Sequence, residues 1–327
     1  MMLTGTIRPL PAPPADMRSA ACGELTRAVE RLMSLQEGDR GVLDVVACGA
    51  GAIPRLRTLL FKREPSGLYQ PRCRVVEALA ALGAGDVLIG FLNADRDTAD
   101  PVEQAGEDAV LNAAARALRG VGDEAFFRRL LSLAETRRLT GPIELLGTFR
   151  RPEALPCLIA ALADDLARPA AEDAIRQYGD AAMGALLAAA SERTVQDGAE
   201  TDSSRRRRRA ALVLLLGIGD AAGVPSQRCA EWVHDNDPLI VVLGCQVALA
   251  GGAPAERRAA IRRLLDMVRA VDWRLRQDIE DCLVEYGDAA RPLIQAVAPA
   301  VSPDEADLSR EAAAQRCLIR IAHRLGI

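Results

Sequence analysis

The chain has 327 residues, of which 50% are hydrophobic and only 3% aromatic, and its formal net charge is −4 at pH 7. This small negative charge gives no general attraction to nucleic acid or to an anionic membrane surface. No stretch approaches the roughly 20 apolar residues that a membrane-spanning helix needs, so we expect a cytoplasmic protein without membrane contact. Good helix formers dominate and strand formers are scarce, which predicts an all-α fold.

The chain begins with a proline-rich segment. Residues 1–20 contain several prolines and lack the long apolar core of a signal peptide. We therefore predict a flexible tail over residues 1–20. We expect residues 21–327 to form a single elongated domain, which starts with an extra helix near residues 24–35.

A glycine–aspartate pair recurs along the chain and separates helical patterns. It begins at Gly85, Gly122, Gly179, Gly219 and Gly287, and at the last three positions it continues as Gly-Asp-Ala-Ala. Recurrence every few tens of residues is typical of solenoids, in which each unit buries its apolar face against its neighbours. The sequence therefore predicts an α-solenoid.

Residues 235–268 show the expected unit most clearly. Asp237 can cap a first helix that starts with Pro238, and the apolar period of this helix ends at Gly251. A second helix with one apolar stripe follows Pro254. The same helix–corner–helix pattern predicts about eight hairpins between residues 41 and 297, followed by a closing helix over residues 310–325.

Two polar insertions interrupt this pattern, an acidic one over residues 93–108 and another over residues 191–204. Insertions in solenoids tend to emerge on one face, where they can bear function. The simpler interpretation, which we favour, is that both are disordered connections.

The repeat pattern resembles the HEAT-repeat superfamily, especially the bacterial PBS-lyase HEAT-like repeats. Matching features are Asp237-Pro238, Ala248-Leu249, Gly287-Asp288 and Pro292-Leu293, and the resemblance covers roughly residues 41–326. It implies a superhelix of HEAT-like hairpins whose second helices line the concave surface.

Two groups of arginines are candidate partner-binding residues. The first is the run Arg205 to Arg209, which could hold an acidic partner or could pair with Asp197, Glu200 and Asp202 in a solvated first turn. The second lies early in second helices, on the concave surface according to the resemblance; its alternative role is a structural ladder, in which Arg129 would pair with Asp123. The partner-binding candidates are Arg128, Arg129, Arg205, Arg206, Arg207, Arg208, Arg209, Arg257, Arg258, Arg262 and Arg263, and Arg55 and Arg57 share their position.

No set of residues predicts catalysis, a cofactor or a metal site. His234 stands beside Asp235 and Asp237, but the turn and the helix cap account for both aspartates. The eight cysteines are scattered without a Cys-x-x-Cys pair, which favours reduced and buried thiols. Of the two tryptophans, Trp232 and Trp273, one could anchor an interface, although burial between repeats is the expectation we favour.

These observations predict a non-enzymatic scaffold or adaptor that binds another protein through its concave face and its insertions. The first alternative is nucleic-acid binding, as in the HEAT-like alkylpurine DNA glycosylases, which need a basic concave surface. A lyase-like or chaperone-like role, implied by the bilin lyase relatives, is the remaining alternative.

Overall fold

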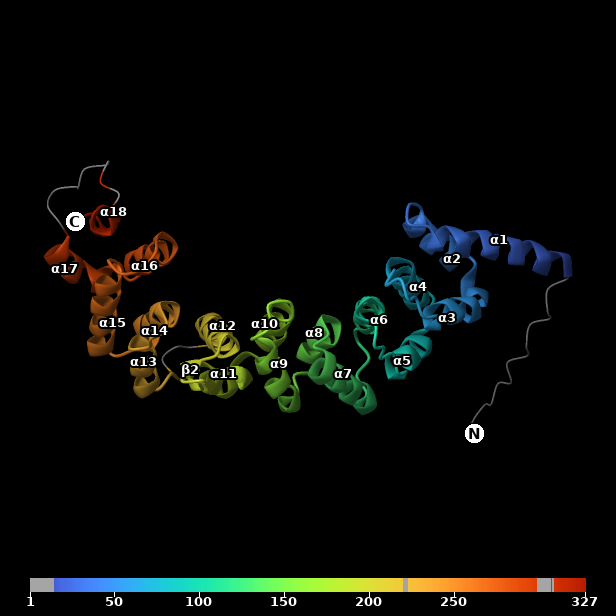
Figure 1. The fold of residues 1–327 in the computed structure, drawn as a ribbon, viewed down its shortest axis with the longest axis horizontal. Coiled ribbons are helices and arrows are strands. Elements are labelled where there is room, and N and C mark those ends of the chain that lie inside the picture. Colours follow the sequence, from blue (N-terminus) through green and yellow to red (C-terminus); the bar gives the residue numbers. More distant parts are fainter. Residues whose placement is uncertain (1–14, 220–222, 299–306, 308) are drawn as a thin grey trace, which may run out of the picture. The chain divides into compact units, whose positions relative to one another are not determined.

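The computed structural model describes residues 15–219, 223–298, 307 and 309–327. Apart from one short hairpin, the regular structure of these residues is helical, as the composition predicted (Figure 1). The chain divides into two compact units, the first ending at Leu145 and the second beginning at Leu146. None of the described helices is both long and apolar enough to cross a membrane.

The first unit consists of helices that pack as two layers. Within it α2 contacts α4 and α4 contacts α6, while α3 contacts α5 and α5 contacts α7. Helix α1 packs against α2 at the N-terminal end. The elements are α1 (Ala15–Met33), α2 (Gly38–Ala47), η1 (Gly49–Ala52), α3 (Ile53–Phe61), α4 (Gln70–Ala81), α5 (Gly85–Asn93), α6 (Pro101–Ala117), α7 (Glu124–Arg137) and the first part of α8 (Thr140–Phe149).

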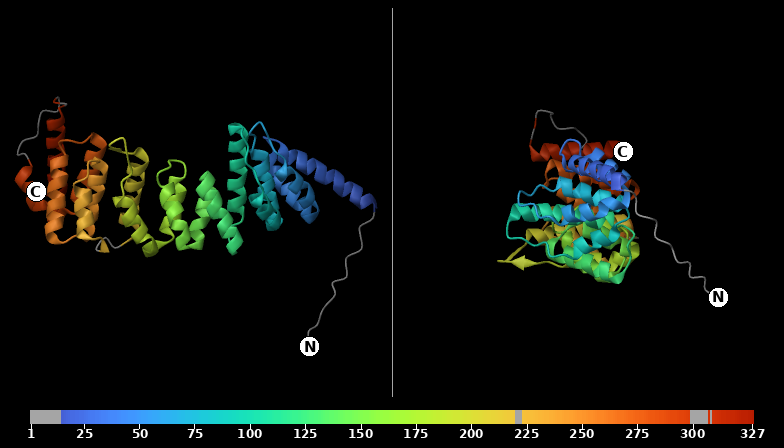
Figure 2. Two further views of the ribbon diagram at one scale, coloured as in Figure 1. Left: turned by 60° about the horizontal axis from the view of Figure 1, so that its bottom comes forward. Right: turned by 90° about the vertical axis from the view of Figure 1, so that its right-hand side faces the viewer.

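The second unit contains the remaining elements. They are η2 (Pro152–Ala154), α9 (Leu155–Ala161), α10 (Arg168–Arg176), η3 (Gly179–Ala182), α11 (Met183–Ser191), β1 (Val195–Gln196), β2 (Ala199–Glu200), α12 (Asp202–Ile218), α13 (Ser226–Val233), α14 (Pro238–Gly251), α15 (Pro254–Met267), α16 (Trp273–Glu285), α17 (Gly287–Val297) and α18 (Arg310–Leu325). The antiparallel β1–β2 hairpin projects from the helices (Figure 2).

The second unit also has two layers. The first helices of successive pairs, α10, α12, α14 and α16, contact one another in that order, and so do the second helices α9, α11, α13, α15 and α17. In Figure 1 the first helices lie on the inner side of the bend of this unit and the second helices lie on its outer side. The HEAT resemblance had implied the reverse, with second helices on the inner side.

The predicted helix boundaries and corners agree closely with the structure. Asp237 caps α14, because its carboxylate accepts hydrogen bonds from the amides of Leu239 (3.0 Å) and Ile240 (3.2 Å). Gly179 begins a short 3₁₀ turn with a φ of 55°, a left-handed conformation that glycine adopts without strain. Gly85 and Gly287 each begin a helix, whereas the part of the Gly219 corner over residues 220–222 lies outside the described residues.

Three predicted segments differ from the structure. The predicted flexible tail over residues 1–20 is wrong from Ala15 onward, because α1 begins there, and residues 1–14 lie outside the described residues. The predicted disorder of residues 93–108 is wrong, because α6 starts at Pro101 behind the cap residue Asp100. The predicted disorder of residues 191–204 is also wrong, because this segment forms the β1–β2 hairpin and the start of α12.

Candidate interaction surface

The arginine run over residues 205–209 lies in the first turns of α12, where Arg208 is buried inside the second unit. Its guanidinium donates to the Ala190 carbonyl oxygen at 3.0 Å and forms ion pairs with Glu200 (2.9 Å) and Asp235. The Arg208 side chain is only 1% exposed. This residue therefore joins α11, the β hairpin and the turn after α13, and it cannot meet a partner.

The other arginines of the run also have partners in the same unit. Arg209 pairs with Asp237 and Arg205 with Asp202, while Arg206 lies 3.1 Å from the Asp165 carboxylate. Arg207 donates to the Glu192 carbonyl oxygen at 3.0 Å. The run thus contributes ion pairs within the fold, among them the predicted pairs with Glu200 and Asp202.

Asp235 is the carboxylate on which these contacts converge. Its Oδ2 accepts hydrogen bonds from both Arg208 and Arg193, the latter at 2.5 Å, and its Oδ1 accepts the amide of Asp237 at 2.9 Å. Burial raises the pKa of this carboxyl group, but the hydrogen bonds and positive charges lower it further, so the net pKa lies below its usual value. Asp235 therefore stays ionised within the fold.

Arginines early in second helices have a structural role that differs from the predicted ladder. Arg129 does not pair with Asp123, which caps α7 by accepting the amide of Phe126 at 2.8 Å. Arg129 instead donates to the Leu92 carbonyl oxygen, at 2.6 Å, at the end of α5. Arg263 of α15 donates in the same way to the Val233 carbonyl at the end of α13, at 3.3 Å.

The same type of contact recurs on first helices. Arg72 of α4 donates to the Leu60 carbonyl oxygen near the end of α3 at 2.9 Å, and Arg208 of α12 does so at Ala190 of α11. The last carbonyl groups of a helix have no hydrogen-bond donor within the helix, and they carry a partial negative charge. A guanidinium group can donate a hydrogen bond to such a carbonyl and also balances the charge. Each of these four arginines therefore connects its own helix to the end of a preceding one.

The remaining candidate arginines are exposed. Arg128 forms an i,i+4 ion pair with Glu124 at 2.7 Å. Arg257, Arg258 and Arg262 of α15 are exposed and form no ion pair with the described residues. Arg258 and Arg262 are four residues apart and share one face of the helix. These three residues are what remains of the predicted arginine surface.

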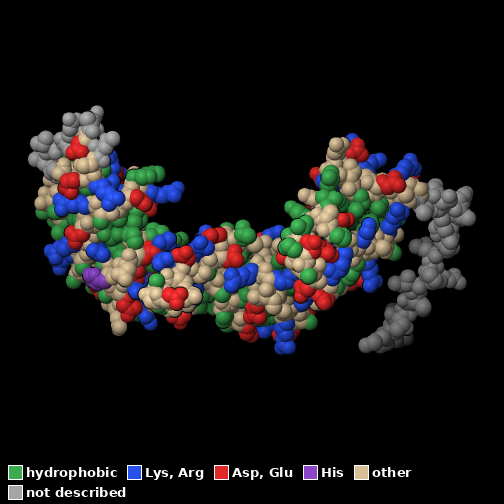
Figure 3. Space-filling view, in the orientation of Figure 1, with side chains coloured by type: hydrophobic (Ala, Val, Ile, Leu, Met, Phe, Trp, Pro, Cys, Tyr) green, Lys and Arg blue, Asp and Glu red, His purple; other side chains and the backbone are tan. Residues whose placement is uncertain are grey.

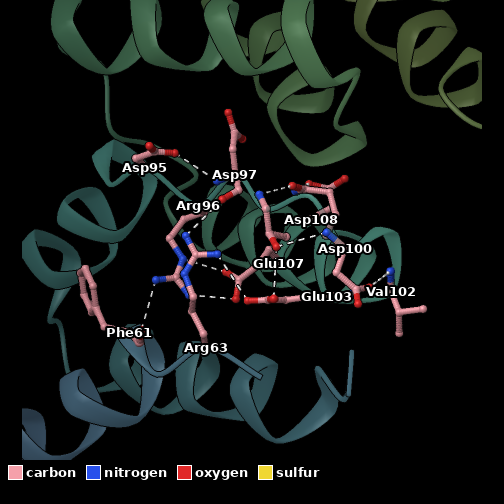
Figure 4. A network of polar contacts seen from close by, with 12 residues as sticks. Phe61, Arg63, Asp95, Arg96, Asp97, Asp100, Val102, Glu103, Glu107 and Asp108 are labelled. Carbon is pink, nitrogen blue, oxygen red and sulfur yellow. Dashed lines mark hydrogen bonds and ion pairs between the residues drawn. The ribbon is translucent and has the colours of Figure 1, made fainter. Parts of the chain in front are cut away.

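The acidic insertion of the first unit contributes to a buried network of ion pairs (Figure 4). Glu107 of α6 is fully buried and accepts hydrogen bonds from Arg72 (2.6 Å) and Arg96 (2.7 Å). Both guanidiniums also lie over the Phe91 ring, at 5.6 Å and 5.2 Å from its centroid. Burial raises the pKa of Glu107, but the hydrogen bonds from the two arginines outweigh it, and the net pKa is lowered.

Three further acidic residues of the insertion, Asp97, Glu103 and Asp108, also pair with arginines. Glu103 lies 3.3 Å from the Arg63 guanidinium and accepts a hydrogen bond from the Thr98 hydroxyl at 3.1 Å. Arg137 of α7 pairs with Asp97 at 3.1 Å and also with Asp108. These pairs connect the insertion to α7 and to Arg63, which follows α3.

The two tryptophans differ in burial. Trp232 of α13 is fully buried, as expected. Trp273, at the start of α16, is 75% exposed, which overturns the expectation of burial for this residue. Its neighbour Arg274 is exposed and has no ion pair among the described residues. Hydrophobic and basic side chains project from one end of α16 in Figure 3.

The sequence contains a signal for this exposure. The apolar stripe of α16 runs through Leu275, Ile279 and Leu283, all of which are buried. Trp273 is two residues before Leu275, so it lies well off the stripe on a helix of 3.6 residues per turn. The helical period therefore placed Trp273 outside the core.

The residue types that commonly form metal sites are dispersed among the described residues. No group of three His, Cys, Asp or Glu side chains among them could hold a metal ion. His234 is exposed, while Asp235 and Asp237 are occupied by arginines and amides. Burial raises the pKa of Cys245 to about 12, so this thiol is not a nucleophile at neutral pH.

The chain matches no protein-family model, and no curated protein matches it.

Proposed function

We propose that this chain is a non-enzymatic protein-binding scaffold, an α-solenoid of about eight hairpins that resemble HEAT repeats. The succession of paired helices supports this proposal, as does the layered packing within each unit. Trp273 is the single observation that carries it, because its side chain is 75% exposed and tryptophan is among the residue types most enriched at the sites that dominate the binding energy of protein interfaces.

The surroundings of Trp273 favour a protein partner. Tryptophan and arginine are the residues most enriched among those that contribute most to the binding energy of protein interfaces, and here Trp273 is followed by the unpaired Arg274. Helix α16 belongs to the inner layer of the second unit. The binding surface we propose is therefore the inner face of this unit, formed by first helices.

Nucleic-acid binding has less support from the same contacts. Most of the candidate arginines bind carboxylates or carbonyls of the fold, and among the candidates only Arg257, Arg258 and Arg262 are exposed without an ion pair to the described residues. Proteins that bind duplex DNA commonly neutralise about 6–10 phosphates. A gel-shift titration with duplex DNA at low salt should show no binding, and a shift abolished by Arg257→Glu with Arg262→Glu would favour the nucleic-acid alternative.

The proposed function is tested by affinity purification of the tagged full chain from a lysate of its native host. We expect one protein to be recovered at a fixed stoichiometric ratio and to remain bound after purification. Repeated recovery of the chain alone would count against a scaffold.

A further inference from the structure

Helix α16 carries an excess of negative charge on its exposed face. Asp278, Asp281 and Glu285 are all exposed and share this face, because they lie three and four residues apart along the helix. Arg274 is the only exposed basic residue of α16. Asp281 pairs with Arg324 of α18 at 2.8 Å, whereas Asp278 and Glu285 form no ion pair with the described residues. The face therefore presents two exposed carboxylates without a cation.

These carboxylates lie where a helix disfavours negative charge. The C-terminal end of a helix carries a partial negative charge, so basic side chains stabilise the last turn and acidic side chains destabilise it. Helix α16 has no basic residue in its last turn and ends at Glu285 itself. Asp281 and Glu285 are four residues apart, so their like charges also repel each other. The arrangement lowers the stability of the free chain, and a cation supplied by a partner would relieve the repulsion.

The same helix exposes Trp273 and belongs to the inner layer of the second unit (Figure 1). Asp278 and Glu285 are seven residues apart, which is about 10 Å along a helix axis. The face of a tryptophan ring attracts cations, and exposed carboxylates accept charge-assisted hydrogen bonds from lysine and arginine. The charge of this face is thus complementary to a basic segment.

We propose that the protein partner presents a basic segment to α16, with two lysine or arginine side chains about 10 Å apart that pair with Asp278 and Glu285. This inference rests on the proposed function and names the chemistry of the partner. Nucleic acid and anionic membranes are negatively charged, so the same two carboxylates repel them from this face.

The test is the selection of phage-displayed random peptides on the immobilised full-length protein at low ionic strength. We expect the selected peptides to carry more positive charge than the starting library. Fluorescence anisotropy of a labelled selected peptide should then show binding that weakens as the NaCl concentration rises, because salt screens exposed charges.

Two double variants with the same change in net charge locate the binding surface. Asp278→Asn with Glu285→Gln should weaken binding of the selected peptide about fivefold or more, because two ion pairs are lost. The same variant should raise the Tm of the free chain, measured by circular dichroism, because it removes unfavourable charges. Glu30→Gln with Glu77→Gln, at exposed positions of α1 and α4 that form no ion pair with the described residues, should leave the affinity unchanged.

Four results would overturn the proposal. They are selected peptides that are neutral or acidic, selection of no peptide at all, equal affinity of the two double variants, and a lower Tm after neutralisation of Asp278 and Glu285, which would give these carboxylates a structural role. Recovery of a stoichiometric partner from the native lysate alongside any of these results would still support the scaffold, so the two proposals fail separately.

Discussion

At the scale of single residues, buried arginine–carboxylate pairs are the main polar feature of both units. Arg208 with Asp235, and Arg72 with Glu107, are almost completely removed from solvent. Removing one partner of such a pair is expensive, because an uncompensated charge stays buried. Within the arginine run and the acidic insertion, Arg208 and Glu107 therefore have a specific role in the stability of the fold.

Two neighbours in the arginine run provide a matched test of this role. Arg208→Ala should lower the free energy of unfolding by about 3–5 kcal/mol, because Asp235 and Glu200 both lose their contact with a buried guanidinium. Arg205→Ala should leave stability unchanged, because its pair with Asp202 lies at the surface. Urea unfolding followed by Trp232 fluorescence, in the Trp273→Phe background, measures both. Equal losses in the two variants would contradict a structural role that is specific to Arg208.

The lowered pKa values of Glu107 and Asp235 predict how stability depends on pH. Each carboxyl group has a lower pKa folded than unfolded, so its stabilisation is present above the unfolded pKa of about 4 and is lost as pH falls through the folded pKa. Glu107→Gln and Asp235→Asn should therefore be less stable at pH 7 and show a shallower loss of stability between about pH 5 and 2. If the free energy of unfolding of both variants falls with pH as steeply as that of the wild type, the predicted pH dependence is wrong.

Individual residues were the hardest features to predict from the sequence. The period of α16 contained the information that Trp273 lies off the apolar stripe, whereas the choice of Arg208 among five consecutive arginines depends on where Ala190, Glu200 and Asp235 meet. Such a meeting point is set by tertiary packing, and no local pattern encodes it.

At the scale of elements, arginines that donate to the ends of preceding helices explain why this residue type recurs at similar positions. The sequence showed the recurrence but suggested aspartates as the partners. Asp123 is already used as a helix cap, so Arg129 is left to bind the Leu92 carbonyl. Helix boundaries and caps were predictable because they depend on neighbouring residues, whereas contacts between helix pairs were not.

A comparison of Arg129→Ala with Arg128→Ala tests the contact between Arg129 and the Leu92 carbonyl. Arg129→Ala should destabilise the first unit by about 1–2 kcal/mol, because the Leu92 carbonyl loses a charged donor. Arg128→Ala should have little effect, since its exposed pair with Glu124 contributes little. Hydrogen exchange of the amides in α5 and α7 measures the local change. The carbonyl contact is unimportant if both variants exchange alike.

At the scale of the whole chain, the sequence predicted an all-α protein with helices in successive pairs, and the structure has both features. The glycine–aspartate corners were sufficient to predict the helix pairs, because each corner is formed by residues that are neighbours in the sequence. Which layer lies on the inner side of the second unit was not predictable, since the bend depends on the sum of many helix contacts. Because first helices lie on the inner side of the second unit, the binding surface that we propose includes the first helix α16 and not the arginines of the second helices.

We propose that the chain binds a protein through Trp273 and Arg274, whereas most of the candidate arginines stabilise the fold. The most direct measurement compares partner recovery by quantitative mass spectrometry among tagged variants that are equally folded. We predict that Trp273→Ala with Arg274→Ala lowers recovery at least about tenfold. Arg257→Glu with Arg262→Glu should leave recovery unchanged, as should Leu43→Ala, which truncates another exposed apolar residue. Full recovery by the Trp273 and Arg274 variant, or loss only in the Arg257 and Arg262 variant, would contradict the account.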